Sequence, residues 1–379
     1  MNAAAESIDS GTVLITGGAG FVGSHLADNL LAAGYRVRAL DNLGEQVHGA
    51  SITRPAYLND DVELIRGDVR DADAVARALR GVDAVYHFAA AVGVGQSMYE
   101  IERYTDVNNR GTAVLLEALV KQPVRRLVVA SSMSIYGEGL YRDPRGNVVA
   151  PPERSPAQLR NGEWELQHDS SELQPLPTPE SKIASPSSVY ALSKYDQEKL
   201  CLMIGQAYDI PTVALRFFNI YGTRQALSNP YTGVLAIFAA RFLNRKPPLV
   251  FEDGKQRRDF VSVHDVARAC RLALETPHIG GSVFNIGSGR SISIIELAQE
   301  MARAMGIDDL PPQITRKYRV GDIRHCFADT SLAARHLRFT PQVELADGLS
   351  ELVEWISTQQ AFDRVDAASE ELARRGLSL

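Results

Sequence analysis

The sequence has few cysteines, no long apolar run and little net charge, and each shortage excludes a class of protein. Three cysteines stand far apart among 379 residues, without a CxxC pair, so we expect neither a disulfide framework nor a structural metal. The first apolar run, residues 13–15, is far too short for a signal peptide or a membrane span. A formal charge of −6 gives no overall attraction to nucleic acid or anionic lipid. We therefore expect a cytoplasmic protein that meets any anion through local basic residues.

Short apolar stretches alternate with helix-period segments along the first 220 or so residues. This alternation is typical of βαβ units and predicts an α/β fold with a doubly wound parallel sheet. Expected strands lie at residues 12–16, 36–40, 62–65, 83–87, 126–130 and 212–216, and expected helices at 21–33, 71–79, 101–121 and 189–208.

The chain divides into two predicted domains. Residues 1–222 form the first, and the shorter elements of 223–379 predict a smaller C-terminal substrate-binding lobe, with 259–276 returning to the first domain. Residues 138–187 interrupt the first domain as a Pro-rich insertion that holds eight of the chain's 18 prolines. We expect this insertion to be irregular, to have Trp164 as its one large apolar anchor, and to cover or line the functional site. A passive surface elaboration or subunit contact is the alternative.

A glycine-rich turn follows the first strand and opens a helix. Gly17, Gly20 and Gly23 would allow a tight turn, close approach of a pyrophosphate and close helix packing. Asp41 ends the second strand, near the spacing of about 20 residues expected of a ribose-binding carboxylate. Because a carboxylate repels a 2′-phosphate, NAD is favoured over NADP, although Arg36 and Arg38 leave NADP open.

Three polar side chains, a phenol, an ammonium and a hydroxyl, are predicted at the carboxyl edge of the sheet. Tyr190 and Lys194 stand one helical turn apart on the same face of the helix at 189–208. Ser132 follows the fifth strand, at the edge where doubly wound sheets bind ligands. A phenol, an ammonium and a hydroxyl in this arrangement suit proton transfer at a substrate oxygen.

Together, the TGGAGFVG run at 16–23, Asp41-Asn42, SSMSIYG at 131–137, the Tyr190/Lys194 pair and RFFNIYG at 216–222 resemble the extended short-chain dehydrogenase/reductase family. Within it, the chain resembles the nucleotide-sugar 4-epimerases, over about residues 13–355 apart from the insertion. The insertion itself is similar to that of a subgroup that includes the dTDP-L-rhamnose 4-epimerases, but it lacks cysteine pairs.

The resemblance implies a Rossmann fold, a homodimer formed through the helices at 101–121 and 189–208, and a dTDP- or UDP-hexose substrate. It also implies that Ser132, Tyr190 and Lys194 are catalytic. Tyr190 would take the proton of the sugar O4 while NAD takes the C4 hydride, and the hydride would return to the other face of the rotated 4-keto sugar.

The implied site residues fall into two groups, with no metal ligand among them. Those for the cofactor are Gly17, Gly20, Phe21, Val22, Gly23, Asp41, Asn42, Asp68, Val69, Ala89, Asn108, Tyr190 and Lys194. Those for the substrate are Ser132, Asn219, Arg258, Arg319, Asp322 and Cys326. Asn219 and the two arginines would hold the diphosphate and Asp322 the nucleoside ribose. Cys326 stands where many relatives carry a tyrosine that closes the sugar pocket, which suggests room for a bulkier sugar.

Other reactions remain open to different degrees. Dehydratases of the family carry an Asp-Glu pair where this chain has Met133 and Ser134, and its uronate decarboxylases carry a glutamate in place of Ser134. A 4-ketoreductase would use the same catalytic residues as an epimerase, and a UDP-glucuronate type of epimerase is also open. From another class, a non-catalytic NAD-binding sensor is disfavoured by the intact catalytic residues.

Overall fold

The computed structural model describes residues 10–49, 53–151, 153–169, 171–227, 229, 231, 233–307, 309–319, 321–359 and 365–378. Residues 1–9, part of the segment judged to lack a targeting signal, lie outside this description. No helix within the described ranges is long and apolar enough to cross a membrane.

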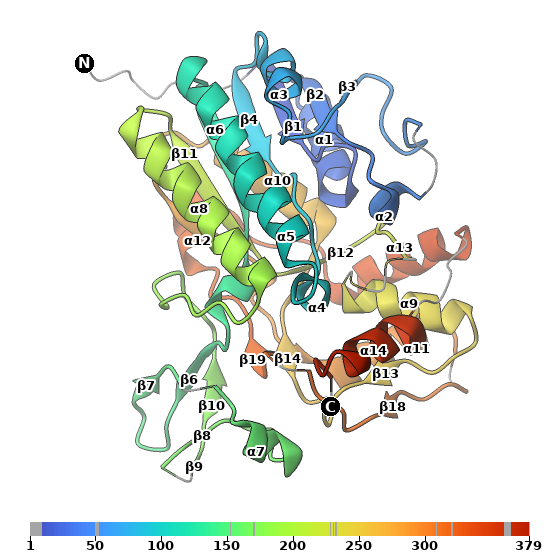
Figure 1. The fold of residues 1–379 in the computed structure, drawn as a ribbon. Coiled ribbons are helices and arrows are strands. Elements are labelled where there is room, and N and C mark those ends of the chain that lie inside the picture. Colours follow the sequence, from blue (N-terminus) through green and yellow to red (C-terminus); the bar gives the residue numbers. More distant parts are fainter. Residues whose placement is uncertain are drawn as a thin grey trace.

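The first lobe is built on a seven-stranded sheet in which every neighbouring pair is parallel (Figure 1). Its strands in spatial order are β16 (Val283–Ile286), β11 (Thr212–Phe217), β5 (Arg126–Ser132), β4 (Ala84–His87), β1 (Thr12–Thr16), β2 (Arg36–Asp41) and β3 (Glu63–Arg66). The order reverses next to β1, as in doubly wound folds. The predicted α/β sheet is confirmed, and the strand ends define one edge for a ligand.

Two apolar layers attach helices to the two faces of this sheet. One layer packs α1 (Phe21–Ala32), α10 (Val263–Glu275) and α12 (Ser331–Leu337) against it, and the other packs α3 (Ala72–Leu79), α6 (Gly111–Lys121) and α8 (Val189–Ala207). Figure 1 shows α6 and α8 side by side across one face. Helix α10 packs by Val266, Ala269, Cys270 and Ala273, an i, i+3, i+4, i+7 stripe. Beyond residue 222, α10, β16 and α12 thus belong to the first lobe's layers, whereas 259–262 includes strand β15.

The helix predicted over 101–121 is interrupted by a wider turn. It consists of α5 (Ile101–Tyr104), a π-helical segment η1 (Thr105–Arg110) and α6. π-Helical turns occur frequently at functional sites because they redirect a side chain. Here the redirected side chain is Asn108, which is fully buried.

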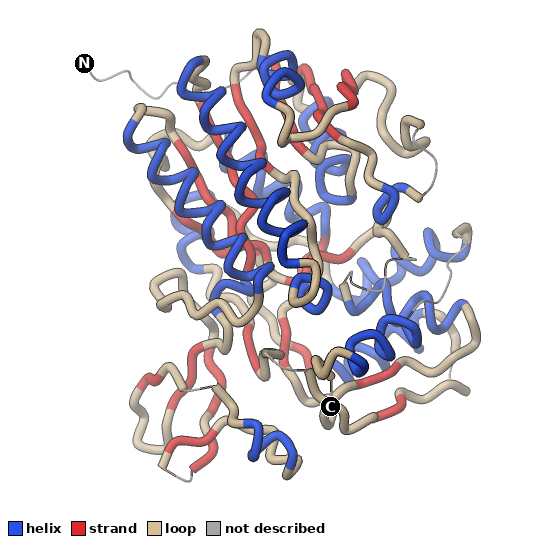
Figure 2. Tube along the Cα trace, in the orientation of Figure 1, coloured by secondary structure: helices blue, strands red, loops and turns tan. Residues whose placement is uncertain are grey.

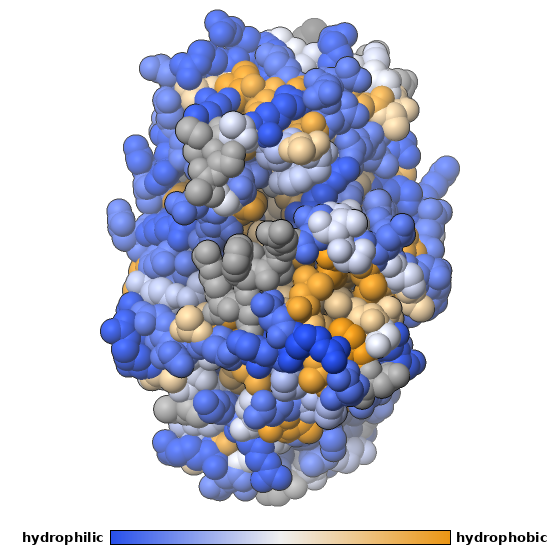
Figure 3. All heavy atoms as spheres, turned by 90° about the vertical axis from the view of Figure 1, so that its right-hand side faces the viewer, coloured by the Kyte–Doolittle hydropathy of each residue, from blue (hydrophilic) through white to orange (hydrophobic). Residues whose placement is uncertain are grey.

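The second lobe combines helices with short strands. Its core lies among α9 (Val234–Leu243), α11 (Ile294–Ala304) and α13 (Leu345–Ser357). Paired strands are β12 (Asn219–Tyr221) with β15 (Phe260–Ser262), β13 (Leu249–Val250) with β18 (Gln313–Ile314), and β14 (Arg257–Arg258) with β17 (Ile292–Ser293) and β19 (His325–Cys326). Helix α14 (Val365–Arg374) lies over this lobe (Figure 2). Figure 3 shows a largely hydrophilic face with apolar residues gathered near its middle.

The Pro-rich insertion is more regular than the sequence predicts. Strand β6 (Leu140–Arg142) pairs with β7 (Val148–Val149) and β10 (Gln174–Leu176), and α7 (Pro156–Arg160) and the pair β8 (Gln167–His168) and β9 (Ser171–Glu172) complete it (Figure 1). Tyr141, Leu166 and Leu173 form a small apolar core of their own. The prediction of one apolar anchor at Trp164 was therefore wrong, and that indole lies 6.2 Å from the ring of Tyr318, in the second lobe.

Candidate active site

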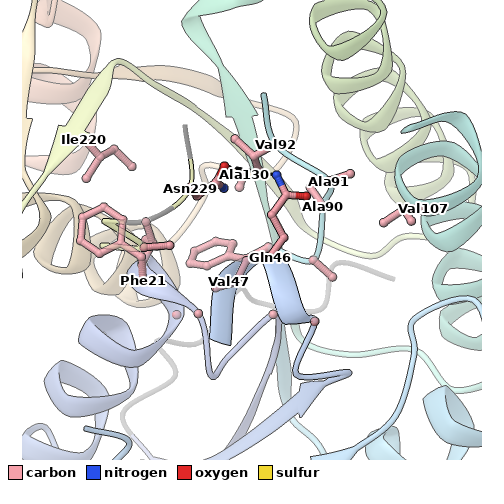
Figure 4. A pocket seen from close by; sticks show the side chains of 18 of the residues that line it. Phe21, Gln46, Val47, Ala90, Ala91, Val92, Val107, Ala130, Ile220 and Asn229 are labelled. Atoms are coloured by element: carbon pink, nitrogen blue, oxygen red, sulfur yellow. Dashed lines mark hydrogen bonds between the residues drawn. The ribbon is translucent and has the colours of Figure 1, made fainter. Parts of the chain in front are cut away.

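A cavity of about 690 Å³ opens at the carboxyl ends of β1, β2, β4 and β5 and continues to β12 (Figure 4). Figure 4 shows Phe21 and Ile220 on one side of it and Ala90, Ala91 and Val92 on the other. Ligands of doubly wound sheets bind at this edge, next to the reversal of strand order. Most of the residues predicted to bind the cofactor line this cavity: Gly17, Gly20, Phe21, Val22, Gly23, Asp41, Asn42, Asp68, Val69, Ala89, Tyr190 and Lys194.

The glycine turn has no room for larger side chains. Gly17 has φ +72°, and a Cβ there would lie 3.0 Å from the amide nitrogen of Ala89. A Cβ on Gly23 would lie 2.4 Å from the carbonyl oxygen of Gly17, so this glycine lets α1 pack on the turn. Gly20 caps α1 without a side chain, and Phe21, Val22 and Gly23 of the first helical turn line the cavity. This cradle fits the pyrophosphate of a dinucleotide.

Asp41 braces the turn from the end of β2. Its carboxylate accepts hydrogen bonds from the backbone N–H of Ala19 at 3.0 Å and of Leu43 at 2.9 Å. The side chain is buried but still borders the cavity. A negative charge held here suits the two hydroxyls of an adenosine ribose and opposes a 2′-phosphate.

Asp68 is held by its neighbours rather than left free. Arg70 donates to its two carboxylate oxygens at 2.8 and 2.7 Å, and the Asn42 amide donates at 3.1 Å. The hydrogen bonds from Arg70, above all, lower the pKa of Asp68 to about 2. The cavity therefore keeps a fixed negative charge at this end.

The three predicted catalytic residues meet at the other end of the cavity. Ser188 caps α8 by accepting from the N–H of Ala191 at 3.1 Å, which places Tyr190 in the first helical turn. Ser132 ends β5 and lines the same end of the cavity, where its hydroxyl is hydrogen-bonded to the Ser134 hydroxyl at 2.7 Å. Burial raises the pKa of Tyr190, and the nearby Ser132 hydroxyl acts against this rise. The phenol therefore needs a nearby positive charge to ionise near neutral pH.

Lys194 lies on the next turn of α8 and also lines the cavity. Its ammonium is almost fully buried, and burial lowers its pKa to about 8. It donates to the side-chain oxygen of Gln197 at 2.6 Å. The sequence analysis missed Gln197, although its position three residues after Lys194 on a helix places the two side chains together.

Asn108 lies behind the cavity wall, contrary to the predicted cofactor contact. Its amide accepts from the N–H of Ala91 at 2.7 Å, and donates to the Ala91 carbonyl at 3.1 Å and the Ser193 hydroxyl at 2.9 Å. The π-helical turn brings it to these partners. It fixes the wall between β4 and α8 instead of touching the cavity.

Of the residues predicted for the substrate, Ser132 and Asn219 line the cavity. Asn219 donates to the Asp259 carbonyl at 2.9 Å. Arg258 and Asp322 lie outside it, and Arg258 turns toward the backbone that directly precedes β19. Its guanidinium donates to the Arg324 carbonyl at 2.9 Å and lies 3.5 Å from Asp322.

Arg319 and Cys326 also lie outside the cavity. The Arg319 guanidinium lies 4.2 Å from the ring centroid of Phe251, and its backbone pairs with Ser378 near the C-terminus. Cys326 is fully buried, with its thiol 3.8 Å from the Thr178 hydroxyl, and burial raises its pKa to about 12. The thiol does not line the cavity and packs with Met133, Ile135, Tyr136 and Phe218 instead. A role at the sugar stays a prediction.

A cluster at the cavity mouth was not predicted. The helical turn α2 (Glu45–His48) brings Gln46 across the opening, where it donates to Gln96 at 2.9 Å and Asn229 at 3.2 Å (Figure 4). Gln96 belongs to α4 (Val94–Ser97), whose Ser97 accepts from the N–H of Tyr190 at 3.0 Å. Nothing in the sequence indicates that Gln46 lies at the cavity mouth, because a single amide side chain produces no periodic pattern.

The insertion does not line the cavity with any of its described residues. It contacts the second lobe through buried ion pairs instead: Glu165 with Arg324 at 2.5 Å, and Arg154 with Glu252 at 2.8 Å. The prediction that it lines this cavity is therefore not met, whereas a covering role at the functional site stays a prediction. Its contacts support the segments next to β14 and β19. Among the described residues, no group of three His, Cys, Asp or Glu side chains could hold a metal ion.

Comparison with known proteins agrees with this geometry. A family model described as the NAD dependent epimerase/dehydratase family matches residues 13–159 and 165–287. The dTDP-L-rhamnose 4-epimerase of Burkholderia thailandensis is 36% identical over 365 residues, which cover 95% of this chain and 98% of that protein.

Solved structures agree as well. The UDP-glucose 4-epimerase of Thermus thermophilus in complex with NAD has 31% identity and a TM-score of 0.72, covering 92% of this chain and 100% of that one. The UDP-glucuronic acid 4-epimerase of Bacillus cereus, in complex with UDP-glucuronic acid and NAD, has 29% identity and a TM-score of 0.74, covering 91% and 99%. The chain therefore belongs to the NAD dependent epimerase/dehydratase family.

Proposed function

We propose that this chain is an NAD-dependent 4-epimerase of nucleotide-diphosphate sugars. The observation that carries the proposal is the continuity of one cavity, which runs from the glycine turn to Ser132, Tyr190 and Lys194 and on to Asn219. A dinucleotide in the cradle would present its nicotinamide to the same residues that can hold a sugar hydroxyl.

The nicotinamide, when bound, supplies a reversible acceptor for the C4 hydride. Tyr190 takes the O4 proton, and Ser132 holds the reacting oxygen by a hydrogen bond. Lowering a phenol pKa from about 10 to about 7 needs roughly 4 kcal/mol of differential stabilisation. Lys194, with a pKa of about 8, is mostly cationic at neutral pH and favours the phenolate.

The residues after Ser132 favour epimerisation over the other reactions of the family. Met133 and Ser134 begin the short 3₁₀ helix η2 (Met133–Tyr136), and Ser134 accepts or donates to Ser132 at 2.7 Å. Neither side chain supplies the acid that dehydration across C5 and C6 would need. Return of the hydride to the opposite face of the sugar needs no further acid, so this set of groups suffices.

The cavity wall beside the catalytic helix favours a neutral sugar. Val92 lines the cavity with 54% of its side chain exposed, next to Ala90 and Ala91. An apolar wall suits the methyl or hydroxymethyl group at C6 of a hexose and disfavours a uronate carboxylate. We therefore propose a dTDP- or UDP-hexose as substrate, in line with the activity of the Burkholderia relative.

Arg319 is the better placed of the two proposed diphosphate-binding arginines. Its Nε is buried with no hydrogen-bond partner among the described residues, and burial lowers its pKa. An anionic diphosphate would satisfy that donor. Arg258 and Asp322 would have to exchange their present partners to join it, and Cys326 would act only through packing.

We further propose a cytoplasmic homodimer that forms through α5, α6 and α8. Apolar side chains on these helices are exposed, at 56% for Ile101, 57% for Leu192 and 62% for Met203, and burying them in a subunit contact is favourable. The cysteines are free and buried, which suits a reducing compartment.

Incubation of the purified protein with a panel of dTDP-, UDP- and GDP-sugars, followed by NMR, tests the proposed activity. Conversion to the C4 epimer without added cofactor supports it. Net consumption of NADH or NADPH would instead identify a 4-ketoreductase, and binding of NAD without any conversion would identify a sensor.

A further inference from the structure

A chain of buried polar side chains leads from the cofactor cradle to the catalytic lysine. Thr16 on β1 contacts His87 on β4 at 2.9 Å, and His87 contacts Thr112 on α6 at 2.9 Å. Gln197 on α8 donates to Thr112 at 2.9 Å and accepts from Lys194 at 2.6 Å. All five side chains are at least nine-tenths buried, so each polar atom depends on its neighbours in the chain.

At the Thr16 end of this series of side chains, the hydrogen bonds determine which nitrogen of His87 carries the proton. The Thr16 oxygen accepts from the N–H groups of Phe88 and Ala89, each at 3.2 Å, so its own proton points to Nδ1 of His87. Nε2 of His87 then carries the ring proton and donates to Thr112. Burial, with the nearby Lys194 charge, lowers the pKa of His87 to about 3, and the ring stays neutral.

The same reasoning fixes the amide of Gln197. The Thr112 hydroxyl donates to the carbonyl of Asn108 at 2.5 Å, so its oxygen accepts from the Gln197 NH₂ group. Reversal of the amide would put two oxygens together at Thr112 and two donors together at Lys194. The carbonyl oxygen of Gln197 must therefore face the ammonium.

We propose that Gln197 is a positioning residue for the epimerase reaction, which fixes the Lys194 ammonium beside Tyr190 and keeps it charged. This inference rests on the proposed function. An acceptor held by Thr112, which His87 fixes in turn, limits the rotation of the lysine, and its bond to the ammonium stabilises the charged form against burial. Gln197 touches neither reacting atom and acts through Lys194.

The test compares pH profiles of two substitutions with a matched control. The titratable groups that face Lys194 are Glu198 and Cys201 on its own helix and His87 on β4, and all are kept, as is Tyr190 one helical turn earlier. Gln197→Met removes the acceptor, so the alkaline limb of kcat should move to lower pH by about one unit. Gln197→Glu places a carboxylate there and should move that limb to higher pH. Gln206→Met, at an exposed position of α8, should leave the profile unchanged.

NAD affinity, measured by calorimetry at pH 7 and pH 9, provides a readout without turnover. Gln197→Met should weaken binding more at pH 9 than at pH 7, since less Lys194 is charged. If the wild-type chain binds NAD but converts no sugar, the proposed function fails while this comparison still tests Gln197. Unshifted profiles and unchanged affinity in both variants, with thermal unfolding confirming that they are folded, would overturn the proposal. Gln197→Glu, which keeps the shape of glutamine, guards against a folding defect in Gln197→Met.

Discussion

The guanidinium of Arg324, in the second lobe, is fully buried and donates to the carboxylate of Glu165 in the insertion at 2.5 Å. Arg324 also bonds Glu252 at 2.9 Å and Asp253 at 2.7 Å. Arg324, which directly precedes β19, thus joins the insertion to the segment that precedes β14. The insertion therefore serves as a support for the second lobe.

Removal of this arginine should destabilise the protein strongly. Arg324→Met takes one partner from the buried carboxylate of Glu252 and from the half-buried carboxylates of Glu165 and Asp253, so the free energy of unfolding should fall by about 3–5 kcal/mol. Arg245→Met, which breaks the exposed pair with Asp309, should cost about 1 kcal/mol or less. Denaturant unfolding of both variants measures the difference, and equal losses would contradict a supporting role for the insertion.

The same cluster predicts a pH dependence of stability. Hydrogen bonds and charge from His325 and Arg324 lower the pKa of Glu165 to about 2, against an unfolded value of 4.5. A carboxylate with a lowered pKa stabilises the fold above pH 4.5, and this contribution is lost as the pH falls toward 2. Glu165→Gln should therefore be less stable than wild type at pH 6, with the gap closing toward pH 2. A gap that stays constant over this range would show that the charge of Glu165 does not matter.

Replacement of the proposed base should abolish most of the activity. Tyr190→Phe removes the phenol oxygen that takes the O4 proton, so kcat should fall by about 10²–10⁴-fold, while NAD still binds. Tyr208→Phe, at an exposed tyrosine that ends the same helix, should behave as wild type. Turnover measured by NMR checks both, and near-normal rates for Tyr190→Phe would refute its role.

Cofactor choice should depend on the charge at the end of β2. The wild-type protein should bind NAD at least about tenfold more tightly than NADP, because Asp41 repels a 2′-phosphate. Asp41→Asn removes the negative charge and should therefore reduce the ratio of the NADP and NAD dissociation constants. The substitution also weakens one hydrogen bond to the glycine turn. Calorimetry with both cofactors measures the ratio. Equal or tighter binding of NADP by the wild type would contradict the assignment.

Arg319 should contribute to binding of the nucleotide sugar and not to binding of NAD. Arg319→Met removes the buried guanidinium, so the dissociation constant of the sugar nucleotide should rise about tenfold. Arg316→Met, three residues earlier and exposed, is the matched control. If both variants bind the sugar nucleotide as wild type does, the diphosphate lies elsewhere.

The sequence predicts the fold and the meeting of Ser132, Tyr190 and Lys194 at one cavity, for a physical reason. Parallel strands can be predicted from the pattern and the length of their apolar runs. Because their carboxyl ends must meet at one edge, the topology brings Ser132, Tyr190 and Lys194 together. The strands of the insertion, β7 for example, are two or three residues long and show no periodicity. That is why the small sheet around Tyr141 was not predicted.

The direction in which a side chain points was the second property that the sequence did not predict. Arg258 has many rotamers, and the backbone carbonyls of Ile323 and Arg324 attract its guanidinium, so its position in the sequence did not tell whether it faces the cavity. Asn108 was assigned to the cofactor by the family resemblance, and the π-helical turn that redirects it leaves no clear pattern in the sequence. Gln197 was missed because a single glutamine on a helix is usually solvated, and only its buried partners show otherwise.

The most direct test of the account is conversion of a nucleotide sugar without added cofactor. Purified protein, with the NAD it retains identified by mass spectrometry, is incubated with dTDP- and UDP-hexoses in deuterated water, and the C4 proton is followed by NMR. The account predicts an equilibrium mixture of C4 epimers in which that position keeps its original hydrogen, because the same hydride leaves and returns. Exchange of the C4 hydrogen with solvent, or no conversion by the NAD-loaded protein, would contradict it.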